Sequence, residues 1–210
     1  MSEKLEIYDL DENLIEVKER DEFYKEIKEE FKKTGKITKQ VKRVLLLLMN
    51  SQGKIVLQKR SLSKQENSGL FDKTIGGHVE KECSYEVALI KECAEELGYP
   101  VSILGNDDFS KALKKTDLKI VGICKKIDYN SNFESVRISK SGKKFIQPYI
   151  QTVYIGYCNS SIQFIDGESS GIQLYTIKEL EDAIRINPND FTNDLKILFE
   201  KYKDKLKPII

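Results

Sequence analysis

The 210-residue sequence predicts an α/β fold, in which β-rich runs alternate with segments of helical periodicity. The most apolar run, residues 41–49, is too short to cross a bilayer, so we expect a buried strand there. Further along, Ser84 and Gly98 bound a segment typical of a helix with a capped start and a glycine end. A chain of this length can bury a sizeable core in one domain.

Two elements are expected before this strand. Two β-like segments flank a polar turn and predict a small hairpin. Apolar side chains then recur at helical spacing until Gly35, which predicts a helix. The hairpin strands are residues 5–8 and 14–17, and the helix positions are Phe23, Ile27 and Phe31. We therefore expect residues 1–38 to form an added hairpin and helix that pack on a main domain at residues 39–210.

Strands and helices alternate along the rest of the chain. The expected strands are residues 55–60, 70–75, 101–104, 117–129, 145–157 and 172–175. A helix through residue 184 is expected after a capping box formed by Thr176 and Glu179, and residues 192–205 predict a closing helix. The polar segments 105–116 and 131–144 are expected to be a loop and a long hairpin connection.

Composition restricts the classes of function. The formal net charge of +1 gives no general attraction to nucleic acid, so we expect no nucleic-acid partner. No apolar run reaches the ~20 residues of a membrane helix, and the first residues lack the order of a secretion signal, which favours a cytoplasmic protein. Four scattered cysteines indicate reduced thiols, and a single histidine, His78, does not support a multi-histidine zinc site or a catalytic triad.

Three glutamates crowd one part of the helix that starts at Ser84. Glu92, Glu95 and Glu96 are three and four residues apart, so their carboxylates lie near one another. Mg²⁺ and Mn²⁺ prefer carboxylate oxygens and bind one or two carboxylates together with substrate phosphates. The alternative is a solvated helix face in which glutamate serves helix propensity. A separate buried stripe is expected at Val87, Ile90, Ala94 and Leu97.

Gly76 and Gly77 stand between the strand expected at residues 70–75 and this acidic helix. Glycine lets the backbone approach a ligand closely, because it has no Cβ. The order of strand, glycine pair, short loop and glutamate-rich helix brings a backbone carbonyl and several carboxylates to one point. The sequence therefore indicates a phosphate and metal site at residues 76–98.

Residues 77–99 resemble the Nudix box, which reads Gly, five residues, Glu, seven residues, Arg-Glu-apolar-x-Glu-Glu-x-Gly-apolar. The segments Ile7-Tyr8-Asp9-Leu10-Asp11-Glu12-Asn13 and Leu70-Phe71-Asp72 further resemble the branch of Nudix hydrolases related to isopentenyl-diphosphate isomerase. The resemblance implies the Nudix α/β/α sandwich with a mixed sheet, an α+β arrangement, to which the N-terminal hairpin and helix are added.

Two positions depart from the box. Cys83 stands where the family has Glu, and Lys91 stands where it has Arg. In the family these two residues commonly pair and brace the loop against the helix, so the changes bear on loop geometry more than on metal chemistry. Glu82, one residue earlier, is a candidate partner for Lys91. A reactive thiol is the alternative for Cys83, because a cation and a helix N-terminus both lower a thiol pKa.

The resemblance implies roles for the residues of the site. Glu92, Glu95 and Glu96 would bind metal and activate water, with Glu96 and the Gly76 carbonyl favoured as metal ligands and Glu92 as the base of some members. Mg²⁺ or Mn²⁺ is the implied cofactor. Glu168, or its rival Glu134, would supply the additional downstream carboxylate that the family often uses, and an ordinary turn carboxylate is the alternative reading of Glu168.

Three further residues are candidates for substrate binding. Arg60 ends an expected strand, and its planar fork suits a phosphate, although a surface cation is an equal alternative. Gly77 and His78 lie at the start of the box, where the backbone and the imidazole would face the substrate. A structural role is the alternative for a lone histidine beside a turn.

The predicted reaction is metal-dependent hydrolysis of a diphosphate linkage in a nucleoside diphosphate derivative or related organic diphosphate, with water attack at phosphorus. Cys83 and Lys91 leave open a non-catalytic Nudix-like nucleotide-binding module. Isopentenyl-diphosphate isomerase is disfavoured, because its Cys-Ser-His-Pro-like segment has no counterpart here. The opening hairpin and residues 131–144 are candidate homodimer surfaces, and nothing in the sequence selects a dimer over a monomer.

Overall fold

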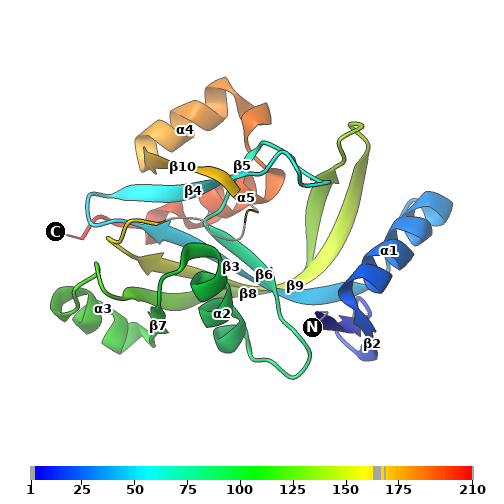
Figure 1. The fold of residues 1–210 in the computed structure, drawn as a ribbon, viewed down its shortest axis with the longest axis horizontal. Coiled ribbons are helices and arrows are strands. Elements are labelled where there is room, and N and C mark those ends of the chain that lie inside the picture. Colours follow the sequence, from blue (N-terminus) through cyan, green and yellow to red (C-terminus); the bar gives the residue numbers. More distant parts are fainter. Residues whose placement is uncertain (1–2, 163–166, 168, 210) are drawn as a thin grey trace.

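The computed structural model describes residues 3–162, 167 and 169–209 (Figure 1). Its strands are β1 Lys4–Tyr8, β2 Leu14–Glu19, β3 Gln40–Met49, β4 Lys54–Arg60, β5 Phe71–Asp72, β6 Ile75–His78, β7 Val101–Ile103, β8 Gly122–Ile138, β9 Lys144–Tyr157 and β10 Ser169–Thr176. Its helices are α1 Arg20–Thr34, α2 Tyr85–Leu97, α3 Asn106–Lys115, α4 Ile177–Ile186 and α5 Asn193–Tyr202, with 3₁₀ turns at Pro188–Asp190 and Lys203–Lys205.

The strands form one mixed sheet around β3. β3 lies between β4 and β9 along the path β10-β4-β3-β9-β8-β7, and it also pairs with β1 and β6. The β3–β9 pair is parallel, with Leu45 opposite Val153, whereas β6 runs antiparallel to β3, with Gly76 opposite Leu45. This arrangement places the glycine pair beside the central strand.

Alternate side chains of β3 enter two different cores, because successive residues of a strand point to opposite faces. Leu45 and Leu47 belong to the cluster that includes residues of α3, α4 and α5, whereas Leu46 and Leu48 pack in the cluster of α2. Figure 1 shows α2 in front of the sheet and α5 behind it. The expected buried strand and the α/β/α sandwich with a mixed sheet are confirmed.

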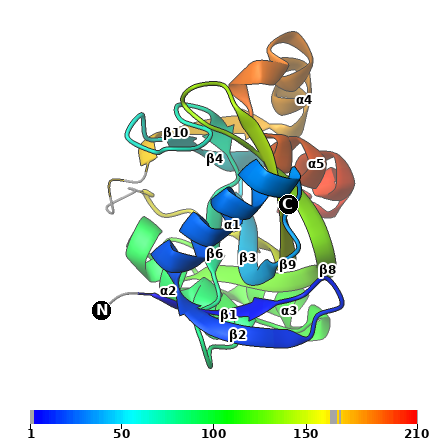
Figure 2. The ribbon, with the colours of Figure 1, turned by 90° about the vertical axis from the view of Figure 1, so that its right-hand side faces the viewer.

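The N-terminal hairpin and helix are present as expected. β1 pairs with β2, and it also pairs with the start of β3, with Ile7 opposite Val41. Phe23 and Ile27 of α1 are buried, and Gly35 ends the helix in a left-handed conformation with φ 74°. Figure 2 shows α1 crossing in front of β3 and β9. The division of the chain into domains at residue 38 stays a prediction.

Two expected connections are wrong. Residues 131–144 belong mostly to strands, because β8 continues to Ile138 and β9 begins at Lys144. The segment looks like a loop because it is rich in small and charged residues, but Arg137 lines a polar cavity and Ser135 is buried and donates a hydrogen bond to Asp194. The expected loop at 105–116 contains α3, in which Phe109 alone is buried and most of the other residues are polar.

The strand expected at residues 70–75 is also divided. It forms the two short strands β5 and β6, and β6 includes Gly76 and Gly77 themselves.

The buried face of α2 differs from the expected one. Val87 is 52% exposed and Ile90 is 43% exposed, and Ala94 is exposed as well. The residues that enter the core are Ala88, Leu89, Cys93 and Leu97, together with Glu96. The apolar pattern gives the wrong phase because the inner face carries carboxylates. The inner face of α2 therefore directs its acidic residues toward the sheet.

Helix ends follow their predicted caps. The Ser84 side chain accepts a hydrogen bond from the backbone N–H of Val87, and Gly98 ends α2 with φ 59°. Thr176 and Glu179 form the expected capping box of α4. Thr192 caps α5 by accepting a hydrogen bond from the backbone N–H of Leu195. In the part of the chain that the structure describes, no helix has the length and apolar character to span a bilayer.

Gly156 of β9 provides a test of the core. A Cβ at this position would lie 2.5 Å from Cys124 Sγ and 2.9 Å from Leu48 Cδ2, because three strands meet closely there. We expect Gly156→Ala to lower the free energy of unfolding by about 1–3 kcal/mol. Urea unfolding measures the change, and Gly171→Ala is the control, since no heavy atom lies within 4 Å of its added Cβ. Equal losses in the two variants would contradict this packing.

Candidate active site

A pair of carboxyl groups on α2 lies against the glycine pair of β6. Glu92 and Glu96 are one helical turn apart, and their side chains are hydrogen-bonded to each other. A Cβ built on Gly77 would lie 1.9 Å from Glu92 Oε1. Only glycine therefore permits this approach of the carboxyl group to the strand.

Burial raises the pKa of the Glu92 carboxyl to about 7, and its hydrogen bond with Glu96 acts in the opposite direction. The nearby charges of Glu3 and Glu95 raise the pKa further, because they oppose a third negative charge. Two hydrogen-bonded carboxyl groups must share a proton, so the pair is partly protonated at neutral pH. A pKa near neutrality suits a group that exchanges protons during a reaction.

The donor set fits a hard divalent cation. Mg²⁺ commonly uses one or two protein carboxylates and completes its shell with water and substrate phosphates. Glu92 and Glu96 supply two such carboxylates, and Gly77 leaves the space in which they meet the backbone. Glu95 lies farther out, with its side chain 58% exposed. Among the described residues, no three His, Cys, Asp or Glu side chains are already arranged around a metal position.

One of the two downstream candidates can be placed in the structure. Glu168 lies outside the described residues. Glu134 is exposed on β8, opposite Pro148, and is absent from the walls of the cavity described next.

A cavity of about 430 Å³ opens beside the glycine pair. Four of the residues expected at the site line it, namely Arg60, Gly76, Gly77 and His78. Seven cationic side chains and three carboxylates also line it: Arg20, Lys28, Arg43, Arg60, Lys64, Lys73 and Arg137, with Asp21, Glu66 and Asp72. Phosphate groups are the ligands that such a concentration of guanidinium and ammonium groups favours. The sheet thus brings the predicted phosphate-binding residues together.

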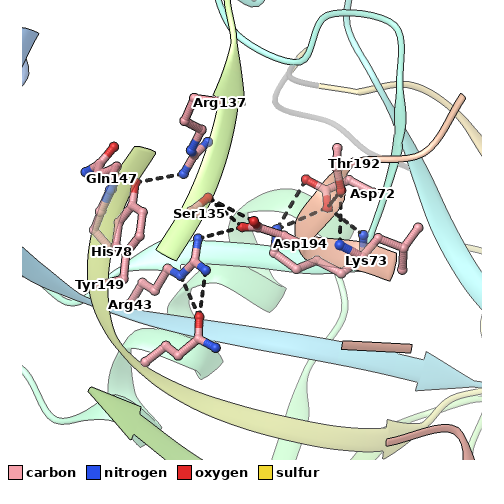
Figure 3. Close-up of polar contacts among 12 residues, drawn as sticks. Arg43, Asp72, Lys73, His78, Ser135, Arg137, Gln147, Tyr149, Thr192 and Asp194 are labelled. Carbon is pink, nitrogen blue, oxygen red and sulfur yellow. Dashed lines mark hydrogen bonds and ion pairs between the residues drawn. The ribbon is translucent and has the colours of Figure 1, made fainter. Parts of the chain in front are cut away.

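Buried ion pairs form the floor of this cavity (Figure 3). Arg43 Nη1 donates to Asp194 Oδ2 at 2.9 Å, and Ser135 donates to the same carboxylate. Asp72 accepts hydrogen bonds from Lys73 and from the Thr192 hydroxyl. Burial raises the pKa of Asp72, but the charges of Lys73 and Arg60 outweigh it and lower the pKa to about 2. The Asp72 carboxylate in the floor therefore stays charged at neutral pH.

His78 is held at both ring nitrogens. Its Nε2 lies 2.7 Å from the Tyr24 hydroxyl, and its Nδ1 lies 3.3 Å from Glu3 Oε1. Burial lowers the pKa of His78 below its usual value, and the Glu3 carboxylate opposes this shift. The imidazole therefore lines the cavity as a neutral group fixed by two partners.

Several cavity residues are missed by sequence reasoning. Arg43 lies in the apolar run of β3, where a buried cation is unusual and is a usable signal. Arg137 lies in the segment expected to be a connection. Tyr24 and Arg20 belong to α1, whose many charged residues are typical of a solvated face. Only the folded arrangement brings them to one cavity.

Comparison with known proteins decides the family. A family model described as NUDIX domain matches residues 39–195. The chain belongs to the NUDIX domain family. It is a Nudix hydrolase by this family membership. A curated protein of Methanosarcina mazei named prenyl-diphosphate phosphatase is 24% identical over 192 residues, which cover 90% of this chain and 88% of that protein.

Solved structures share the fold at low identity. The DR0079 protein of Deinococcus radiodurans has a TM-score of 0.60 and 19% identity, over 95% of this chain and 98% of that chain. A MutT protein of Methanosarcina mazei has a TM-score of 0.51 and 17% identity, over 79% and 94%. A bifunctional NMN adenylyltransferase/ADP ribose pyrophosphatase of Francisella tularensis, complexed with AMP and a Mn ion, has a TM-score of 0.53 and 15% identity, over 89% and 47%.

The departures from the Nudix box have a structural counterpart. Lys91 forms an ion pair with Glu80, whereas the candidate partner Glu82 pairs with Lys81. Glu82 adopts a left-handed backbone conformation with φ 62°, which turns its side chain toward solvent, where it pairs with Lys81. Cys83 packs against the apolar cluster of α2. The Glu80–Lys91 pair thus connects the loop to the helix, as the Glu–Arg pair does in the family.

The raised pKa of Glu92 predicts a pH-dependent stability in metal-free protein. The unfolded chain loses this proton near the ordinary pKa of 4.5, whereas the folded chain keeps it until about pH 7. The wild type should therefore lose stability relative to Glu92→Gln as the pH rises through this window, by about 1–2 kcal/mol after allowance for partial exposure. Urea unfolding with a chelator, at pH values on both sides of the window, measures the difference. A difference independent of pH would contradict the raised pKa.

Proposed function

We propose that the protein hydrolyses the diphosphate linkage of a nucleoside diphosphate derivative or related organic diphosphate, with Mg²⁺ or Mn²⁺ as cofactor. The observation that carries the proposal is the position of the Glu92–Glu96 pair behind Gly77, which itself lines a cavity that contains seven cationic side chains. Cationic walls suit the phosphate oxygens, and a carboxyl pair of raised proton affinity suits a water molecule that must lose a proton.

Different residues carry out different steps of the proposed reaction. Cations of the cavity, including Arg60, bind the phosphate oxygens and orient the linkage. A water molecule attacks phosphorus, the bond from phosphorus to the bridging oxygen breaks, and the carboxylate of Glu92 accepts the proton that the water loses. The bridging oxygen leaves with the other phosphate group. His78 is neutral and hydrogen-bonded to Tyr24, so its ring forms a fixed part of the cavity wall during these steps.

The carboxylates are also the proposed metal ligands. Glu96 and the Gly76 carbonyl would hold the cation, with Glu92 on the same inner face of α2. Glu95 is more exposed, and its carboxylate would assist the other two in holding the cation. When bound, Mg²⁺ or Mn²⁺ would neutralise charge on the phosphate oxygens and make a water molecule easier to deprotonate. Glu168 stays a candidate for a further ligand.

The substrate panel follows from the cavity and from the relatives. Nucleoside diphosphate derivatives belong in it, since the Francisella relative is named as an ADP ribose pyrophosphatase. Prenyl diphosphates belong in it, since the Methanosarcina relative is named as a prenyl-diphosphate phosphatase. The cavity itself has charged and polar walls with Leu45 as its aliphatic member, so it suits the diphosphate better than a hydrocarbon tail.

Glutamine substitutions test the assignment. On the best substrate of the panel, Glu92→Gln and Glu96→Gln should each lower kcat by about 100-fold or more, because charge stabilisation and proton transfer are lost. Glu95→Gln should have a smaller effect, because its carboxylate lies farther out. Phosphate release in the presence of Mg²⁺ measures turnover.

The matched control is Glu82→Gln, which removes a solvent-exposed carboxylate that pairs with Lys81. It should keep wild-type turnover. Full activity in both Glu92→Gln and Glu96→Gln would remove the carboxyl pair from the mechanism. Nucleotide or diphosphate binding in calorimetry without turnover of any compound would overturn the proposed hydrolysis.

A further inference from the structure

Arg137 occupies an unusual position in the cavity wall. It comes from the outer part of β8, and its Nη2 donates to the Tyr149 hydroxyl at 2.7 Å. Its guanidinium also lies 5.4 Å from the centre of the Tyr149 ring. The Nε group is buried and has no hydrogen-bond partner among the described residues. A buried donor without a partner is costly, so its retention beside a cavity points to a ligand.

The other cations of the cavity are largely neutralised. Carboxylates of the described residues form ion pairs with five of these cations: Arg20 with Glu3, Lys28 with Glu66, Arg43 with Asp194, and both Arg60 and Lys73 with Asp72. Arg137 forms no ion pair within residues 3–162, 167 and 169–209, and Asp194 and Glu66 act on it only at longer range. Its charge is therefore available to an anion that enters the cavity.

A series of hydrogen bonds fixes Arg137, and the direction of each bond can be deduced; Figure 3 shows the end of the series at which Arg137 meets Tyr149. Arginine only donates, so the Tyr149 hydroxyl accepts from Arg137. At the other end the Glu3 carboxylate only accepts, so neutral His78 donates from Nδ1 and accepts at Nε2 from Tyr24. Tyr24 has then used its hydrogen, and at 3.0 Å its oxygen accepts from Tyr149. Each tyrosine hydroxyl in this series of hydrogen bonds therefore donates in one defined direction.

This series of hydrogen bonds includes a residue of the N-terminal helix. Tyr24 belongs to α1, and its neighbours Phe23 and Ile27 are fully buried under the hairpin. The β1–β2 hairpin contributes the flanking Glu3, which also pairs with Arg20. Tyr149 is fully buried at the start of β9. The segment that precedes the matched NUDIX region thus reaches the wall of the cavity.

We propose that Arg137 binds a phosphate group of the diphosphate substrate, and that Tyr24 of α1 positions Arg137 through Tyr149. This inference rests on the proposed function, and it adds that the N-terminal helix completes the substrate site. The ligand class is a diphosphate, whose paired phosphates carry enough charge to engage Arg137 and the Gly76 side of the cavity together. The planar guanidinium suits two oxygens of one phosphate.

Binding of methylenediphosphonate, a diphosphate analogue with a non-hydrolysable bridge, tests Arg137 apart from catalysis. Calorimetry on the full chain with Mg²⁺ should show that Arg137→Met weakens binding by roughly 10- to 100-fold. Arg137→Lys keeps the positive charge without the planar guanidinium, so its affinity for the analogue should lie between those of Arg137→Met and the wild type. If the methionine variant does not fold, the lysine variant carries the test.

Tyr24→Phe and Tyr149→Phe test the positioning role. Each should weaken binding by roughly 3- to 10-fold and raise KM, with kcat nearly unchanged. In the Arg137→Met background, Tyr24→Phe should cause no additional loss, because its effect passes through the guanidinium. The matched control is Tyr157→Phe, which removes a hydroxyl of similar burial that donates to the Lys207 carbonyl outside the cavity. It should bind like the wild type.

The outcomes separate the two levels of the proposal. If the wild type turns over diphosphates but the Arg137 variants bind methylenediphosphonate as tightly as it does, the inference is overturned and the proposed function stands. If Tyr24→Phe weakens binding equally with and without Arg137, Tyr24 does not act through Arg137, and the positioning role is overturned. If the wild type neither binds the analogue nor hydrolyses any diphosphate, both proposals fail together.

Discussion

The close approach of Glu92 to Gly77 is the contact on which the rest of the site depends. It requires a residue without a Cβ on β6, and it requires that β6 be held against the central strand by the register that places Gly76 opposite Leu45. It also requires α2 to direct its acidic face toward the sheet. The contact moves a carboxyl pair out of water, and the higher proton affinity of Glu92 follows from that burial.

The site separates charge across a short distance. Carboxyl groups gather on the α2 side of the glycine pair, and guanidinium and ammonium groups gather on the cavity side. Such a separation would be unfavourable in a dry interior, but the cavity floor offsets much of it with pairs such as Arg43–Asp194 and Lys73–Asp72. These ion pairs fix the positions of the side chains, but they do not neutralise all of the positive charge in the cavity.

Sequence predicts the framework of this protein better than it predicts the walls of the site. The β3 run, the caps at Ser84 and Gly98 and the capping box at Thr176 are local signals, and local physics decides them. The phase of α2 is mispredicted because Glu92 and Glu96 replace apolar residues on the inner face. The local pattern therefore points to Val87 and Ile90, which are exposed.

Long-range pairing hides the remaining parts of the site. Arg137 and Ser135 look like loop residues until β8 and β9 pair, and that pairing makes a polar strand face into a cavity wall. Glu80 is the partner of Lys91 because Glu82 turns toward solvent, and a single backbone angle decides between the two. The spacing of residues in the sequence does not predict the φ angle of Glu82. The glycines and the glutamates are predicted because the motif places them next to one another in sequence.

The ion pair between Arg43 and Asp194 joins residues 151 positions apart. Its neighbours also connect distant segments, since Tyr24 meets Tyr149 across 125 positions. Contacts of such separation close large loops, and the folded cavity must offset the entropy that this closure costs. A ligand bound between these segments would therefore stabilise the entire fold rather than one local element.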